Sequence, residues 1–221
     1  GMSMSAANIT AIGSLDGAGQ NGGDNNVAYQ IVGQPLGVFY LPHCKGLVKN
    51  ENGSYFYDIE DLDHNGNVDL SDGGDRYIAG QATPKVILGS NISFRYKNYY
   101  VSIQMNGAFG HKIFNGTGLA YTSMACFPDY NVLKDAPKKN IMDQRVSDYW
   151  LEKGDYLNFE HLTIGYNVPL RSKLIRSLRV SCNISNIGTI TGYKGLTPMI
   201  NSYVVNSTMG IDDKRNYPLD R

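Results

Sequence analysis

Alternation of apolar and polar side chains is the clearest pattern in this chain. Between residues 92 and 106 the two kinds alternate with period two on both sides of a short polar pair, Lys97-Asn98. Two such runs joined by a two-residue polar turn predict a β-hairpin. The same alternation returns in residues 162–166 and 178–185. The pattern therefore predicts an antiparallel, all-β fold whose sheet has one apolar and one polar face.

The alternation changes phase once, just before residue 162. Leu157 and Phe159 occupy one phase, and the apolar residues from Leu162 onward occupy the other. An extra residue in a strand produces such a change, so we expect a β-bulge near Glu160 and His161.

Two architectures fit this periodicity. A soluble sandwich buries its apolar faces against each other, whereas an outer-membrane barrel turns them towards lipid. Connection lengths favour the barrel. The connections at Lys97-Asn98 and at residues 167–177 are short, and the stretch 107–155 and the tail from residue 188 are long. Short turns at one end of the strands and long loops at the other are typical of outer-membrane barrels.

Composition divides the chain into three segments. Residues 1–30 are small, polar and rich in Gly and Asn, so we expect a flexible segment. Residues 31–83 have extended character and contain a calcium-type loop. Residues 84–221 hold the alternating strands and the long loops.

The calcium-type loop reads DLDHNGNVDLSD, from Asp61 to Asp72. Oxygen-bearing residues at alternate positions and a Gly at the sharp turn match an EF-hand-like loop, although its last position holds Asp instead of Glu. No helix pattern follows, so a structural clip is expected instead of a sensor. An Asp/Asn/Gly run is also what a metal-free turn looks like, and Asp75 is either an extra ligand or a partner of Arg76. The predicted calcium ligands are Asp61, Asp63, Asn65, Asn67 (through its carbonyl), Asp69 and Asp72.

Charge and motif content exclude several functions. The chain has 20 basic and 20 acidic residues, so it has no basic excess with which to bind nucleic acid. Its three cysteines are far apart and predict no disulfide framework. No nucleophile, metalloprotease or phosphate-loop motif occurs, and we expect a protein that is not an enzyme. Aromatic residues of the long 107–155 stretch, chiefly Tyr130, Tyr149 and Trp150, are candidates for stacking on a ligand or for loop packing.

Several segments occur in the order found in one family. The chain resembles the SusC/RagA-type TonB-dependent outer-membrane transporters of Bacteroidetes. The segments that carry the resemblance are DLDHNGNVDLSDGGDRYIAG, PKVILGSNISFRYKNYYVSIQMNGAFGHKIFN, YLNFEHLTIGYNVP, LRVSCNISNIGTITGYKGLTP and YPLDR. The resemblance implies the C-terminal part of a large barrel in the outer membrane. It also implies a SusD-like lipoprotein and the TonB complex as partners of the parent protein, and a glycan or other nutrient oligomer as cargo.

The chain departs from the family pattern in what it lacks. We expect neither the family's plug nor its TonB box in these 221 residues, and the incomplete barrel would not transport by itself. Its open strand edges would need cover, for example by self-association. The alternative is a soluble, calcium-stabilised β-rich module that binds glycans at the cell surface. The two differ in whether residues such as Val101, Ile103, Met105, Val180 and Ile184 meet in a closed core.

Overall fold

Two compact units make up the chain. Unit 1 combines residues 1–83, 111–153 and 193–221, and unit 2 combines residues 84–110 and 154–192. The structure is a computed structural model, and the residues that it describes are 9–14, 26–71, 73–129, 131–170, 177–200 and 210–212.

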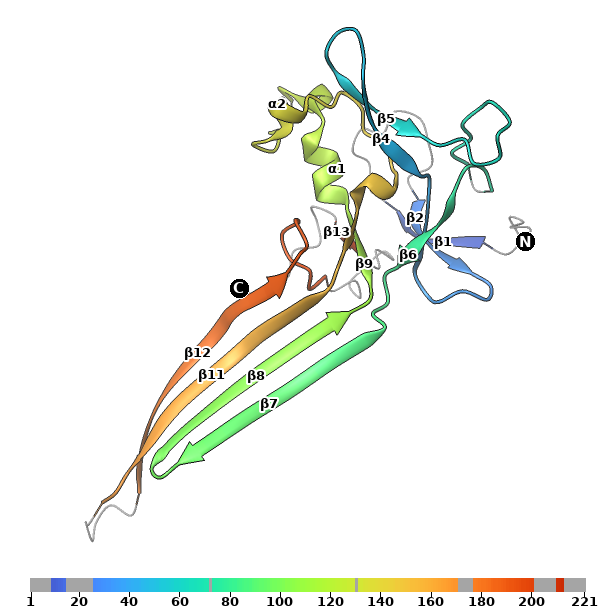
Figure 1. Ribbon diagram of the computed structural model, residues 1–221. Helices are drawn as coiled ribbons and strands as arrows, with labels where there is room; N and C mark the ends of the chain where they lie inside the picture. The colour runs from blue at the N-terminus through green and yellow to red at the C-terminus, as the bar shows by residue number, and fades with distance from the viewer. Residues whose placement is uncertain are drawn as a thin grey trace. The chain divides into compact units, whose positions relative to one another are not determined.

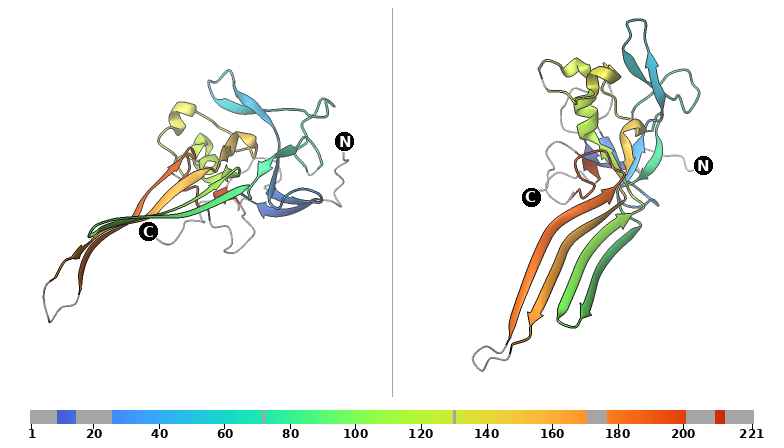
Figure 2. Two further views of the ribbon diagram at one scale, coloured as in Figure 1. Left: turned by 60° about the horizontal axis from the view of Figure 1, so that its bottom comes forward. Right: turned by 60° about the vertical axis from the view of Figure 1, so that its left-hand side comes forward.

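Unit 2 is one four-stranded antiparallel sheet in the order β12-β11-β8-β7 (Figure 1). Its strands are β7 (Val86–Tyr96), β8 (Tyr99–Phe109), β11 (Tyr156–Val168) and β12 (Leu178–Thr191). The views in Figure 2 show the four strands as one curved layer. These described strands form an open sheet and do not close into a barrel.

The predicted hairpin and bulge are both confirmed. Tyr96 pairs with Tyr99, which leaves Lys97 and Asn98 as a two-residue turn. Lys97 has φ of 50°, the positive value that tight hairpin turns require. The register of β11 shifts between Phe159 and His161 against both neighbouring strands.

The connections of this sheet leave from opposite ends. The tight turn and the connection between β11 and β12 lie at the end where Tyr99 pairs with Tyr166. Residues 110–155, which join β8 to β11, leave from the end where Ala108 pairs with Tyr156. The alternation of short and long connections in the sequence therefore corresponds to two different ends of the sheet.

Unit 1 contains three smaller sheets and short helices. The first sheet has the order β1-β2-β3-β6, the second β10-β9-β13, and the third pairs β4 with β5. The strands are β1 (Ile9–Ser14), β2 (Asn26–Ile31), β3 (Val38–Leu41), β4 (Cys44–Lys49), β5 (Tyr55–Ile59), β6 (Tyr77–Gln81), β9 (Lys112–Asn115), β10 (Leu151–Lys153) and β13 (Ile211–Asp212). The helices are α1 (Gly116–Thr122), α2 (Ala136–Lys139), and the 3-10 turns η2 (Met124–Cys126) and η3 (Asp148–Trp150).

The first 30 residues differ from the flexible segment that we expected. Strands β1 and β2 pair as an antiparallel hairpin, and Val27, Ala28 and Tyr29 are fully buried. Average composition hid these strands, because two short apolar runs are diluted by the Gly and Asn between them. Residues 1–8 and 15–25 lie outside the described residues.

The core of unit 1 collects side chains from distant parts of the sequence. Phe39 of β3, Phe114 of β9, Ile141 and Ile211 are fully buried in one cluster with Trp150. Such burial stabilises by about 1.5–3 kcal/mol per large apolar side chain. This burial explains why segments of unit 1 that have the sequence of loops are ordered.

Short helices interrupt the expected long connection between β8 and β11. Helix α1 begins after Asn115, whose Oδ1 accepts a hydrogen bond of 2.7 Å from the backbone N–H of Gly118. This is ordinary N-terminal capping. Among the described residues, no helix is long and apolar enough to cross a membrane.

Candidate functional surfaces

The register of unit 2 assigns each side chain to one of two faces. Directly paired residues share a face, and residues two apart along a strand do too. We call one face the apolar face. It carries Val86, Leu88, Ile92, Phe94 and Tyr96 of β7, Tyr99, Val101, Ile103, Met105 and Phe109 of β8, Leu157, Phe159, Leu162, Ile164 and Tyr166 of β11, and Leu178, Val180, Cys182, Ile184 and Ile190 of β12.

This apolar face is not a buried core among the described residues. Phe94 is 67% exposed, Val180 58% and Ile184 45%. Val101, Ile103 and Met105, all on the central strand β8, are only partly covered. Soluble proteins rarely leave a contiguous apolar patch of this extent uncovered. The face therefore needs an apolar surrounding that the described residues do not supply.

The opposite face of the same sheet, the polar face, consists mainly of uncharged hydrogen-bonding side chains. The hydroxyl of Ser102 donates to Asn91 Oδ1 at 3.0 Å, and the hydroxyl of Thr189 donates to Asn158 Oδ1 at 2.9 Å. These contacts link neighbouring strands across the sheet. The polar face carries Asn91, Ser93, Arg95, Tyr100, Ser102, Gln104, Asn106, Asn158, Glu160, His161, Thr163, Arg179, Asn183, Ser185 and Thr189.

The dimensions of the apolar face match a membrane. Tyr99 and Phe109 are ten steps apart on β8, which at about 3.4 Å per residue spans about 34 Å. A strand tilted by about 40° would then cross about 26 Å, close to the apolar band of about 25 Å in outer-membrane barrels. Tyr96, Tyr99 and Tyr166 form a paired row at one end, where such barrels place aromatic residues.

The calcium-type loop in unit 1 brings three carboxylates together. Oxygen atoms of Asp61, Asp63 and Asp75 lie within 4.8 Å of one another. Carboxylate oxygens at this spacing are the ligands that calcium prefers. Asp61 Oδ2 also accepts a 2.8 Å hydrogen bond from Gly66 N, which closes the sharp turn.

Asp75 organises this loop, although the sequence pattern offered it only as an optional member. Its carboxylate is almost fully buried and accepts backbone hydrogen bonds from Leu62 (2.7 Å), Asp63 (3.2 Å) and Asp69 (2.8 Å). The neighbouring Arg76 donates from Nε to Leu70 O at 2.8 Å, so it fixes the end of the loop. In the sequence, the Asp75-Arg76 pair just after the loop was the feature that indicated this role.

The other predicted ligands have different surroundings. Asn65 Nδ2 donates to Asp63 Oδ2 at 2.7 Å, and Asn65 Oδ1 accepts from Asn67 N at 2.8 Å. Asp69 Oδ1 accepts from Ser71 N at 2.9 Å, and Asp69 does not belong to the group of close carboxylates. Asp72 lies outside the described residues.

Backbone hydrogen bonds stabilise the ionised form of two loop carboxylates. The pKa of Asp61 is lowered, chiefly by the N–H of Gly66, and the pKa of Asp69 is lowered, chiefly by the N–H of Ser71. Both groups are therefore ionised at neutral pH, as a cation ligand must be.

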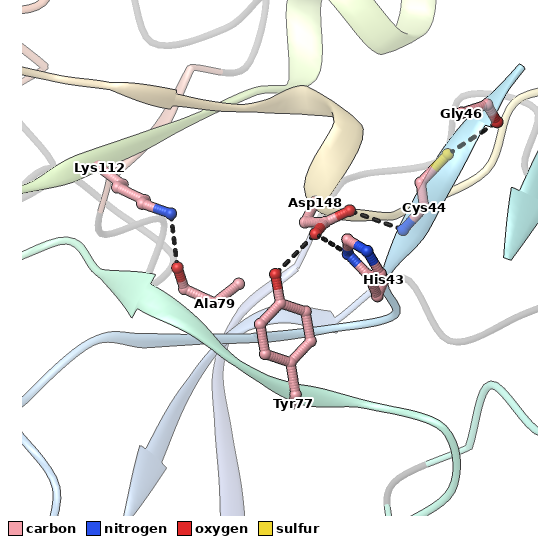
Figure 3. A network of polar contacts seen from close by, with 7 residues as sticks. All are labelled: His43, Cys44, Gly46, Tyr77, Ala79, Lys112 and Asp148. Carbon is pink, nitrogen blue, oxygen red and sulfur yellow. Dashed lines mark hydrogen bonds and ion pairs between the residues drawn. The ribbon is translucent and has the colours of Figure 1, made fainter. Parts of the chain in front are cut away.

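A second polar network in unit 1 centres on Asp148 (Figure 3). Its Oδ2 accepts from Tyr77 Oη at 2.6 Å and lies 2.6 Å from His43 Nδ1, and its Oδ1 accepts from Cys44 N at 2.8 Å. One carboxylate thus joins η3, β6 and the start of β4. The pKa of Tyr77 is raised, first by burial and then by the hydrogen bond to Asp148.

The three aromatic candidates differ in how they are placed. Trp150 is 6% exposed, belongs to the core, and donates from Nε1 to Tyr57 Oη at 3.1 Å. Tyr149 is 38% exposed and makes an edge contact with Trp150. Tyr130 lies outside the described residues. Of the two that the structure describes, Tyr149 has the exposed ring that stacking on a ligand requires, and ligand binding by this group stays a prediction.

Comparison with curated proteins gives two sequence relatives. The chain is 26% identical over 212 residues to TonB-dependent receptor P3 of Formosa agariphila, covering 81% of this chain and 21% of the relative. It is 25% identical over 195 residues to TonB-dependent receptor SusC of Bacteroides thetaiotaomicron, covering 82% and 19%. The chain thus spans about a fifth of the length of these relatives. No family model matches it.

Comparison with solved structures gives chains of RagAB. The RagAB peptide transporter aligns with a TM-score of 0.63 at 16% identity, covering 84% of this chain and 21% of that one. The RagAB peptide importer in its open-open state gives a TM-score of 0.62 at 16% identity, covering 85% and 22%. At these identities the likeness shows the fold.

The fold matches part of the RagAB chains. The sequence matches make the relation specific: the chain is a relative of TonB-dependent receptors of the SusC/RagA type. SusC and RagA are outer-membrane proteins, and the homologues are not enzymes.

Proposed function

We propose that this chain is part of a TonB-dependent outer-membrane importer of glycans or other nutrient oligomers. The observation that carries the proposal is the sheet of unit 2, which has an exposed apolar face on one side and a polar face on the other. In a barrel wall the first would contact lipid and the second would line the lumen. Four strands cannot close a barrel of that class, so transport belongs to the whole protein.

The connections of the sheet suggest its orientation. Outer-membrane barrels have short turns in the periplasm and long loops outside. The strand ends next to Lys97-Asn98 would then face the periplasm, and those near Phe109 and Tyr156 the cell exterior. Tyr96, Tyr99 and Tyr166 would lie at the periplasmic interface.

Spin labels on the two faces test the membrane placement. In the protein reconstituted in lipid vesicles, a label at Phe94→Cys on the apolar face should collide with oxygen more than with a water-soluble nickel chelate. A label at the adjacent Ser93→Cys should show the reverse preference. Both variants are made with Cys44, Cys126 and Cys182 replaced by Ser, and a variant that keeps only Cys182, on the apolar face, gives a second position there. Equal chelate access at residues 93 and 94 would contradict the proposal.

The alternative function is a soluble, calcium-stabilised β-rich module that binds glycans at the cell surface. It requires the apolar face to be covered by protein. The exposed Phe94, Val180 and Ile184 favour the membrane reading. A monodisperse preparation without detergent, with a label at residue 94 protected from both collision reagents, would favour the module instead.

We further propose that calcium orders the loop from Asp61 to Asp75 as a structural clip. Support comes from the close carboxylates of Asp61, Asp63 and Asp75, together with the lowered pKa of Asp61. Calorimetric titration with calcium should release heat for the wild type and not for Asp61→Ala. The control is Asp135→Ala, which removes an exposed carboxylate paired with Lys139 and should titrate like the wild type. Equal heats for the wild type and Asp61→Ala would remove the calcium assignment.

Partners and cargo extend the same proposal. A relative is named SusC, and the matching structures are titled RagAB peptide importer and transporter. For this protein we propose a SusD-like lipoprotein and the TonB complex as partners. Copurification of a SusD-like lipoprotein with the full-length receptor from native membranes would support the first partnership, and its absence from mildly solubilised preparations would count against it.

A further inference from the structure

We propose that the bulge in β11 builds a binding subsite for a neutral, hydroxyl-rich oligomer, namely an oligosaccharide, on the polar face of unit 2. The subsite consists of Glu160, His161, Gln104 and Asn106, with Tyr156 beside them on the same face. The inference rests on the proposed function, because it takes this face to line the path of the cargo.

The bulge puts two consecutive polar residues on one face. In regular β structure, neighbours point to opposite faces. Here the register moves from Phe159 directly to His161, which pairs with Gln104 on the polar face. The intervening Glu160 also reaches the polar face, since its carboxylate accepts hydrogen bonds from Gln104 and Asn106. A bulge often re-aims side chains in this way.

The side chains of this group hold one another in place. Gln104 Nε2 donates to Glu160 Oε2 at 2.9 Å, and Asn106 Nδ2 donates to Glu160 Oε1. On the other side, His161 Nδ1 lies 3.1 Å from the hydroxyl of Ser185. Side chains fixed in this way lose little conformational freedom when a ligand binds.

Hydrogen-bonding capacity remains for a ligand. Within the described residues, Asn106 Oδ1 has no hydrogen-bond partner, but it is enclosed, so the capacity open to a ligand belongs to Glu160 and His161. A carboxylate has about four acceptor sites, and the two amide donors use only two of those of Glu160. The exposed His161 has a second ring nitrogen besides Nδ1. The vacant groups are chiefly acceptors, which suits a ligand with several hydroxyl donors.

Charge and ring chemistry favour a sugar over a charged cargo. Glu160 has the one carboxylate on the described polar face. Hydrogen bonds from the side-chain amides of Gln104 and Asn106 already stabilise its negative charge. Arg95 and Arg179 pair with Tyr100 and Asn167, towards the turn end. Tyr156, two positions from Asn158 on the polar face, offers an aromatic ring next to the group. An aromatic ring can stack on the C–H groups of a pyranose, and the neighbouring planar acceptors can accept hydrogen bonds from its hydroxyls.

Calorimetric titration of the detergent-solubilised full-length receptor tests this subsite. The probes are maltohexaose, laminarihexaose and cellohexaose, with the neutral hexapeptide (Gly-Ser)₃ for comparison. At least one hexasaccharide should bind, and Glu160→Gln and His161→Ala should each weaken its affinity about tenfold. The matched control is Ser93→Ala on the same face, whose hydroxyl contacts only Asn91 and Ser102 in the described sheet and which should bind like the wild type.

Three outcomes would overturn the subsite. These are no binding of any hexasaccharide, tighter binding of the hexapeptide than of every hexasaccharide, and affinity for sugar that is unchanged in Glu160→Gln and His161→Ala. None of them touches the proposed import function, which the face labels at residues 93 and 94 test independently. If instead those labels contradict a membrane sheet while the sugar still binds through Glu160, the import proposal fails and the subsite stands.

Discussion

Replacement of Asp148 is the most direct test of how unit 1 is held together. Asp148→Ala removes one carboxylate whose side chain is 14% exposed and which joins η3 to β6 and to the start of β4. The backbone N–H of Cys44 loses its acceptor at a partly buried position. The side chains of His43 and Tyr77 lose theirs too, but they are 40% and 36% exposed and water can replace the lost partner.

These surroundings set the expected magnitude. A buried donor left without a partner costs about 1–3 kcal/mol, and an exposed hydrogen bond contributes about 0.5–1 kcal/mol. Asp148→Ala should therefore lower the free energy of unfolding by about 3 kcal/mol. For a domain of this size the melting temperature should fall by about 10 °C. Asp148→Asn keeps an oxygen for the N–H of Cys44, so its loss should be about 1 kcal/mol.

Fluorescence of Trp150 reports this unfolding directly. It is the only tryptophan in the chain, it is buried, and it lies in η3 together with Asp148. Urea unfolding of the wild type, both Asp148 variants and the exposed control Asp135→Ala gives the comparison. The reasoning is refuted if Asp148→Ala stays within about 0.5 kcal/mol of the wild type. It is also refuted if Asp148→Asn is as destabilised as Asp148→Ala.

Two further predictions concern tyrosine environments. A Cβ at Gly165 would overlap the ring of Tyr100, so Gly165→Ala should cost about 1–3 kcal/mol, measured by thermal unfolding in detergent, and Tyr100→Ala should relieve the penalty. An additive double variant would contradict this. Burial and the hydrogen bond to Asp212 raise the pKa of Tyr193. The protonated Tyr193 therefore stabilises the folded state below about pH 10, and this stabilisation is lost as the pH rises and the hydroxyl ionises. Tyr193→Phe should flatten that alkaline loss, and an unchanged profile of stability against pH would refute it.

Local pattern was sufficient for the strands of unit 2. Period-two alternation gave the hairpin, and the phase change gave the bulge, because both depend on neighbours within a few residues. Local pattern could not predict strands β1 and β2. Their partner residues are separated by a Gly-rich stretch, and their order depends on packing into the core of unit 1.

The acidic loop shows the same division. The spacing of Asp61 and Asp63 identified this loop in the sequence. The buried Asp75, which accepts hydrogen bonds from three backbone N–H groups of the loop, lies beyond the Asp/Asn pattern. From the sequence, Trp150 was a candidate for stacking on a ligand, because the sequence of a long loop does not show which of its aromatic residues are buried. Only the position of Tyr57, far away in the sequence, shows that its ring belongs to the core.

The order of apolar and polar residues is enough to predict strands with one apolar and one polar face, and to place their tight turn and bulge. These features are local, since side-chain direction follows from backbone period. Two features emerge only when the chain is folded: the described residues leave the apolar face uncovered, and Glu160 and His161 share the polar face. Which faces meet, and which groups a bulge brings together, depend on contacts between residues far apart in the chain.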